Sequence, residues 1–207
     1  MELDDLKNVV EDIINESFKR LDYVYRNHQE INKSSFKLSE DEKMASRLVF
    51  PCYSNNIETR ISEQELRFAF VETFNEYCNA NKVNLFYSIE TPTQDKYCFS
   101  GNNNLSGQFD LVIYNEKLER VCLIEFKAHN KEEKEYSKDF KKLNNAKEGS
   151  KNKVLRYFVN ILKTYNNRTK TSLEKKLKNN NNIKAEFCCY VLKNKDGHGE
   201  DISNVFK

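Results

Sequence analysis

The sequence predicts an α/β fold, in which a mixed central β-sheet is flanked by helices and preceded by an N-terminal helical extension. Two observations support this fold class. Short apolar segments of strand length occur in the middle and near the end of the chain, whereas helical periodicity precedes and separates them. The 207 residues, of which 38% are apolar, suffice for the core of one domain with an extension. We expect the extension to span residues 1–50 and the domain to span residues 51–207.

An amphipathic helix is predicted over residues 3–26, because apolar residues recur there at spacings of three and four. These positions are Leu6, Val10, Ile13, Ile14, Phe18, Leu21 and Tyr25. The helix either packs on the core of its own chain, which we favour, or forms a contact with a second copy or a partner protein. A polar linker over residues 27–37 follows. Ser39 and Glu42 then form a capping box for a short helix that ends before Pro51.

The elements of the central part are a helix and three strands. Ser62 and Glu65 form a capping box that begins a helix, which we expect to reach about Asn79. Strands are predicted at residues 84–91, ending at Pro92, at residues 108–114 and at residues 120–127. The short turn at residues 115–119 predicts that the second and third strands form a hairpin.

Helical periodicity returns after residue 130. Tyr136, Phe140 and Leu143 predict one helix, residues 154–165 a second, and residues 173–177 a short third one. The apolar run at residues 185–192 predicts a last strand, which we expect to be central in the sheet.

Charge and cysteine usage limit the environment of the protein. The net charge is only +2, but the stretch from Lys127 to Lys178 is strongly basic. This asymmetry indicates a nucleic-acid-binding face or, equally, a solvated helix face. The six cysteines form no CxxC pair and lack a histidine at zinc-ligand spacing, so we expect free thiols and no structural zinc. Without a membrane-length apolar run or a signal-peptide core, a cytoplasmic protein with no membrane contact is expected.

Three side chains of the predicted hairpin suggest a metal-assisted reaction. Strand alternation places Glu125 and Lys127 on one face, roughly 6–7 Å apart along the chain. Pairing of the two strands would bring Asp110 close to Glu125. Two carboxylates suit a hard divalent ion such as Mg²⁺ (or Mn²⁺), which leaves coordination positions for a phosphate, while a lysine stabilises the charge that develops there. The alternative is a surface ion pair at the end of a strand.

The motif resembles that of a known superfamily. Asp110, fourteen intervening residues and then Glu125-Phe126-Lys127 are similar to the D-x(n)-E-x-K pattern of the PD-(D/E)XK nucleases, although Phe109 replaces their usual proline. The resemblance covers about residues 62–192 and implies a restriction endonuclease-like core of helix, three-stranded meander, helix and strand. It implies metal ligation by Asp110 and Glu125, with the carbonyl of Phe126 as a further ligand, and catalysis by Lys127. Glu65 is the candidate for the additional ligand on the first core helix, unless it only caps that helix.

The resemblance also implies a function. We expect a divalent-metal-dependent nuclease that hydrolyses phosphodiester bonds, with DNA favoured over RNA, in defence or repair. Lys138 and Lys142, on the helix after the motif, are candidates for binding substrate phosphates, or they belong to a solvated basic face. The alternative function is that of a catalytically silent nuclease-like fold, which binds nucleic acid or protein within a larger complex.

Overall fold

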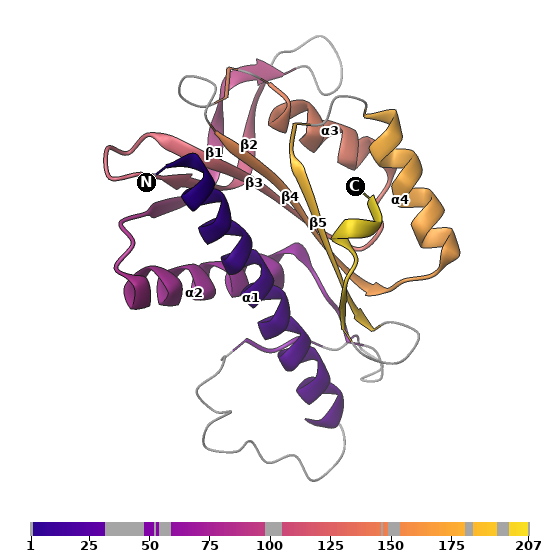
Figure 1. The fold of residues 1–207 in the computed structure, drawn as a ribbon. Helices are drawn as coiled ribbons and strands as arrows, with labels where there is room; N and C mark the ends of the chain where they lie inside the picture. Colours follow the sequence, from indigo (N-terminus) through magenta and orange to yellow (C-terminus); the bar gives the residue numbers. More distant parts are fainter. Residues whose placement is uncertain are drawn as a thin grey trace.

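A mixed β-sheet with helices on both faces forms the centre of the computed structural model (Figure 1). The structure describes residues 2–31, 48–51, 53, 59–97, 105–145, 147–148, 154–180, 184–193 and 199–206. In this part of the chain the strands are β1 (Phe86–Tyr97), β2 (Leu105–Tyr114), β3 (Arg120–Ala128), β4 (Leu155–Thr164), β5 (Glu186–Lys193) and β6 (Glu200–Asp201). The helices are α1 (Leu3–Ile31), α2 (Glu63–Asn81), α3 (Glu133–Leu143) and α4 (Asn167–Asn179), and Ser203–Phe206 forms a 3-10 turn.

The strands lie in the sheet in the order of the sequence, from β1 to β6. β1, β2 and β3 form an antiparallel meander, so the predicted hairpin is confirmed. β4 and β5 run parallel to β3, and β6 runs antiparallel to β5. The connections β3–α3–β4 and β4–α4–β5 step in the same direction along the sheet. Two such connections of the same handedness place their helices on the same face of the sheet. α3 and α4 accordingly lie on one face.

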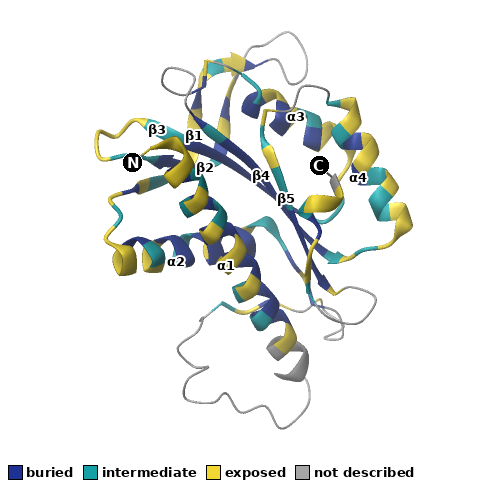
Figure 2. Ribbon diagram, viewed as in Figure 1, coloured by how far each residue is buried: buried dark blue, intermediate teal, exposed yellow. Residues whose placement is uncertain are grey.

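Two hydrophobic cores separate the layers. α1 and α2 cover one face of the sheet, and α3 and α4 cover the other (Figure 1). The buried residues accordingly line the strands and the inner sides of the helices (Figure 2). No helix among the described residues is both long enough and apolar enough to cross a membrane. The described cysteines are free thiols, as predicted: Cys78, Cys122, Cys188 and Cys189.

The apolar stripe predicted for the first helix is confirmed. All seven of its positions are buried in the core that α1 shares with α2 and the sheet. Phe18 stacks on Tyr190 of β5 at a ring distance of 5.1 Å, which connects the helix to β5. The helix continues to Ile31, beyond the predicted start of the linker. The capping box of Ser39 and Glu42 lies outside the described residues, and the boundary at residue 50 stays a prediction.

The helix predicted over residues 154–165 is wrong, because this segment is the strand β4. Every side chain from Arg156 to Leu162 is buried, since helices cover both faces of the sheet here. A strand buried on both faces has no polar side to alternate with its apolar side. Its apolar run therefore carries no period that distinguishes it from a buried helix.

The first and last predicted strands also need correction. β1 does not end at Pro92 but continues to Tyr97, with Pro92 opposite Gln108 in β2. β1 is the edge strand, where a residue that lacks an N–H group leaves no gap in the ladder. β5 lies one strand from the edge of the sheet and not at its centre, since only the two-residue β6 lies beyond it.

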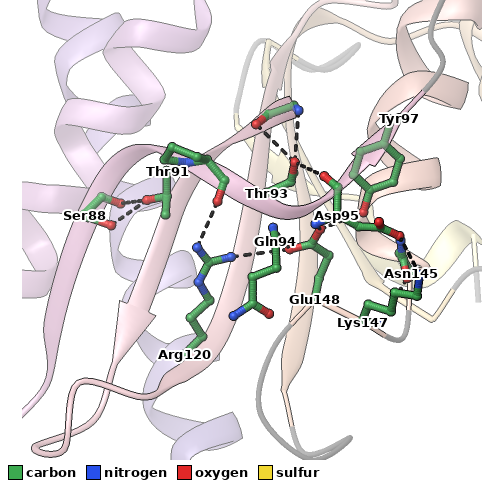
Figure 3. A network of polar contacts seen from close by, with 12 residues as sticks. Ser88, Thr91, Thr93, Gln94, Asp95, Tyr97, Arg120, Asn145, Lys147 and Glu148 are labelled. Carbon is green, nitrogen blue, oxygen red and sulfur yellow. Dashed lines mark hydrogen bonds and ion pairs between the residues drawn. The ribbon is translucent and has the colours of Figure 1, made fainter. Parts of the chain in front are cut away.

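A buried carboxylate holds the far half of β1 in place (Figure 3). Glu148, which is fully buried in the connection after α3, accepts hydrogen bonds from the backbone N–H groups of Gln94 and Asp95 at 2.8 and 2.9 Å. The hydroxyl of Tyr97 donates to it at 2.8 Å, and Arg120 forms an ion pair with it at 3.3 Å. Burial, followed by this carboxylate, raises the pKa of Tyr97. Glu148 thus joins three segments that are distant in sequence.

Replacing Glu148 should therefore destabilise the fold. Glu148→Ala leaves buried donors and the Arg120 guanidinium without their acceptor, and we expect a loss of roughly 3–5 kcal/mol in the free energy of unfolding. Urea denaturation followed by circular dichroism measures it. Lys147→Ala, at an exposed neighbouring position, is the matched control and should leave the midpoint unchanged. Equal midpoints for the two variants would contradict the role of Glu148.

Candidate active site

The candidate site begins where the ladder between β2 and β3 ends. The last paired residues are Leu111 and Ile124, and the same register continued by one residue would place Asp110 opposite Glu125. Instead, the carboxylate of Asp110 accepts the backbone N–H of Phe126 at 2.7 Å. A side-chain oxygen thus replaces a backbone acceptor at this point of the sheet. Asp110 therefore contacts the backbone of β3 at the residue that follows Glu125.

Glu125 and Lys127 point from β3 toward α3. Ile124 and Phe126, which alternate with them, belong to the opposite core beneath α1 and α2. The shared face that strand alternation predicts for Glu125 and Lys127 is therefore present. Both side chains are almost completely buried, at 2% and 9% exposed. Two charged groups at such positions need partners of opposite charge.

Residues of α3 supply these partners. The ammonium of Lys127 lies 2.8 Å from Oδ2 of Asp139, and the ammonium of Lys142 lies 3.0 Å from Oδ1 of the same carboxylate. Lys142 also forms an ion pair with Glu125 and donates a hydrogen bond of 2.7 Å to the carbonyl oxygen of Gln108. The result is a buried chain of alternating charges, Lys127–Asp139–Lys142–Glu125, which we call the inner charge chain.

Helix α2 contributes a second set of charges on the more exposed side. Glu63 and Arg67 are four residues apart and so share one face of the helix. Glu63 lies 3.7 Å from the ammonium of Lys127. Arg67 bridges Asp110 at 2.8 Å and Glu90 of β1 at 3.2 Å. Glu90 has a φ of 48°, a left-handed conformation that is uncommon for a residue with a side chain.

Glu65 does not join this group through any contact that the structure shows. Its carboxylate pairs with Arg60 at 3.1 Å and accepts a hydrogen bond from the hydroxyl of Ser62. Ser62 occupies the N-cap position of α2, but its side chain caps no backbone N–H. The acid of α2 that contacts the motif is therefore Glu63, two residues earlier.

Four residues of the site are not among the site residues predicted from the sequence: Glu63, Arg67, Glu90 and Asp139. Two signals could have identified three of them. The first is the spacing of Glu63 and Arg67, which places an acid and a base on one side of the helix. The second is the buried stripe of α3, because Asp139 lies three residues after Tyr136, at a spacing that faces the core.

The two lysines predicted to bind substrate have different environments. Lys138 is exposed on α3, and its role in phosphate binding stays a prediction. Lys142 is buried, with its ammonium against Glu125, Asp139 and a backbone carbonyl. It therefore belongs to the interior of the site and not to a solvated basic face.

Burial and neighbouring charge shift the pKa values of the site. Burial, and next the charge of Asp139, raises the pKa of Glu125 well above its usual range, although Lys142 opposes the shift. Burial lowers the pKa of Lys127, but Asp139 and Glu63 outweigh it, and the net shift is upward. Burial also raises the pKa of Glu63. A further cation close to Glu125 would therefore relieve part of the cost of ionising this buried carboxylate.

The ion pairs of the site leave an excess of negative charge. Among the described residues they join five carboxylates with three cations, which gives an excess of two negative charges when all are ionised. The carboxylates are Glu63, Glu90, Asp110, Glu125 and Asp139, and the cations are Arg67, Lys127 and Lys142. One divalent ion would balance this excess.

The donor atoms of the site fit a hard divalent ion. Carboxylate and carbonyl oxygens are the ligands that Mg²⁺ and Mn²⁺ prefer. In the described part of the chain, however, no three acidic, histidine or cysteine side chains converge to hold a metal as they stand, because the carboxylates face the protein's own cations. Asp110 and Glu125, with the carbonyl oxygen of Phe126, are the residues that would hold an ion.

The buried ion pair between Glu125 and Lys142 should couple strongly. We expect Lys142→Met to lower the free energy of unfolding by roughly 3–5 kcal/mol, because the buried Glu125 loses its cation and Asp139 keeps only Lys127. The double variant Glu125→Gln/Lys142→Met should lose less than the sum of the single losses. A double-mutant cycle in urea measures the coupling. The exposed pair Glu132–Lys134 is the control and should show none. Additive losses at Glu125 and Lys142 would contradict the pairing.

The chain was compared with protein-family models, with curated proteins and with solved structures, and none of the three comparisons found a match. The resemblance to the PD-(D/E)XK superfamily therefore depends on the motif of Asp110, Glu125 and Lys127 and on the order of the elements. A function for the site has to follow from its geometry and its charges.

Proposed function

We propose that this protein is a divalent-metal-dependent nuclease of the PD-(D/E)XK type, which hydrolyses phosphodiester bonds. One observation supports the proposal most directly. At the end of the β2–β3 ladder Asp110 accepts the backbone N–H of Phe126, the residue between Glu125 and Lys127, in a group of charges with an excess of two negative charges when all are ionised. This combination suits one divalent ion next to a cation that can face a phosphate.

The order of the elements supports the same proposal. The core that the resemblance implies consists of a helix, a three-stranded meander, a helix and a strand. α2, the meander of β1 to β3, α3 and β4 follow one another in this order. The strand after the second helix is β4 and not the strand predicted at residues 185–192.

Asp110 and Glu125 would bind the metal ion, with Glu63 as an outer carboxylate in place of Glu65. An ion bound there would polarise the phosphodiester and lower the pKa of a bound water. Asp110 is already oriented by the N–H of Phe126, while Arg67 balances part of its charge. The side chain of Asp110 is therefore ordered before an ion binds, which limits the cost of ordering it.

Lys127 would stabilise the negative charge that gathers on the phosphate oxygens. Its ammonium is held between Asp139 and Glu63, so its position is fixed from two layers of the fold. Exposure increases from the side chain of Lys127, at 9%, to those of Asp110 and Glu63, at 18% and 31%. Substrate would accordingly approach past the first turn of α2.

A cleavage assay tests the proposal. The wild-type protein should cut labelled DNA or RNA with Mg²⁺ or Mn²⁺ and should stop when the metal is chelated. Asp110→Asn, Glu125→Gln and Lys127→Met should each lose about a hundredfold or more in rate, because each removes a metal ligand or the cation that faces the phosphate. Single- and double-stranded substrates of both kinds identify the preferred nucleic acid.

The control for the assay is Glu65, an acid of α2 that shows no contact with Asp110, Glu125 or Lys127 among the described residues. Glu65→Gln should keep the wild-type rate to within a few-fold, since Glu65 pairs with Arg60 and Ser62. Cleavage that persists unchanged in Glu125→Gln and Lys127→Met would come from a contaminant or another site, and the proposal would then be wrong.

Metal affinity distinguishes the two acids of α2. Glu63→Gln should weaken Mn²⁺ binding about 10- to 100-fold, as expected for a carboxylate that orients or supplements the ligands. Glu65→Gln should leave the affinity unchanged. Isothermal titration calorimetry without nucleic acid gives both values. A larger loss for Glu65→Gln than for Glu63→Gln would restore Glu65 as the ligand.

A second candidate function is that of a nucleic-acid- or protein-binding module without catalysis. The observation that favours it is the pairing of Asp110 and Glu125 with the protein's own cations, Arg67 and Lys142. The same titration separates the two functions. A protein that binds nucleic acid but no divalent ion would be the binding module, whereas a protein that binds one ion and cuts would be the nuclease.

A further inference from the structure

The ammonium of Lys142 lies among three protein oxygens. Two belong to carboxylates, Oε1 of Glu125 and Oδ1 of Asp139 at 3.0 Å, and the third is the carbonyl oxygen of Gln108 at 2.7 Å. These oxygens come from β3, α3 and β2, so three separate elements converge on one positive charge. Such a set of oxygens resembles the ligands of a divalent ion more than the surroundings of a surface lysine.

Burying the charge of Lys142 costs free energy, and a neighbouring position on α3 is exposed to solvent. Lys142 is 4% exposed, whereas its neighbour Lys141 is exposed on the same helix. The ammonium also lies 5.7 Å from the centre of the Phe109 ring, at the border of the apolar core of α3 and α4. A buried ion pair often stabilises a fold less than apolar side chains of the same volume would. The position of Lys142 therefore points to a role beyond stability.

The balance of charge indicates what this role is. With Lys142 included and all groups ionised, the ion-paired groups of the described site have an excess of two negative charges, which one divalent ion would balance. Without Lys142 the excess would be three, and a second ion could bind among the oxygens that the lysine vacates. A lysine cannot dissociate from the site as an ion can, so it fixes the charge on the inner side of Glu125.

We propose that Lys142 is a built-in cation that occupies the place of a second metal ion. The site then takes one divalent ion, on the side of Glu125 that faces Asp110, and Lys142 acts as a positioning residue for the Glu125 carboxylate. This inference depends on the proposed function and deepens it, because it assigns a one-metal site and explains why a lysine predicted to bind substrate is buried.

Counting bound Mn²⁺ without nucleic acid tests the inference. Electron paramagnetic resonance of free Mn²⁺, at increasing metal concentration, gives the number of ions per chain. The wild-type protein should bind one ion, and so should Lys142→Arg, which keeps the cation. Lys142→Met should bind two ions, because Glu125, Asp139 and the Gln108 carbonyl become available. Lys141→Met, the exposed neighbour, is the control and should bind one.

Each outcome separates this inference from the proposed function. Two ions in the wild-type protein, or one ion in a folded Lys142→Met, would overturn the inference while a metal-dependent nuclease could still stand. No bound ion and no cleavage in the wild-type protein would overturn both. The wild-type count needs no substitution, so it decides between one and two ions even when Lys142→Met does not fold.

Discussion

The inner charge chain between β3 and α3 is the constraint on which the rest of the site depends. Lys127, Asp139, Lys142 and Glu125 alternate in charge, and each side chain is less than a tenth exposed. Any displacement of α3 along the sheet would leave at least one of these charges buried without a partner, which costs several kcal/mol. The inner charge chain thus fixes α3 against β3. It thereby also fixes the connection that leads from β3 to the parallel strand β4.

The site forms where this fixed interior meets a more exposed outer layer. α3 neutralises the inner side of the motif through Lys142, while α2 brings Glu63 and Arg67 to its outer side. The two helices lie on opposite faces of the sheet, and their side chains meet because the ladder between β2 and β3 ends at this point. Asp110 lies at this end of the ladder. Its contacts with the backbone of β3 and with α2 join the two layers into one group of charges.

Local patterns predicted those parts of the fold that carry a second local signal besides apolar residues. The stripe of α1 has one buried and one solvated side, and the hairpin of β2 and β3 has a short turn between two apolar runs, although both faces of these strands are largely buried. β4 has neither signal, because helices cover both of its faces, its apolar run carries no strand period, and its pairing with β3 is parallel. The predicted end of β1 at Pro92 was wrong for a different reason, since a proline ends a central strand but is tolerated in an edge strand such as β1. Position in the sheet, which no local window contains, decided both cases.

The sequence by itself determined that Glu125 and Lys127 share one face of a strand and that Asp110 approaches them through a hairpin. These features follow from the two-residue period of a strand and from a short turn, which are local properties of the chain. Only the tertiary structure decided which cation meets each carboxylate, and that Glu63 and not Glu65 contacts the motif. It also decided that Lys142 is buried. Such contacts join residues as far apart as Arg67 and Asp110, and they are selected by the packing of whole helices on the sheet.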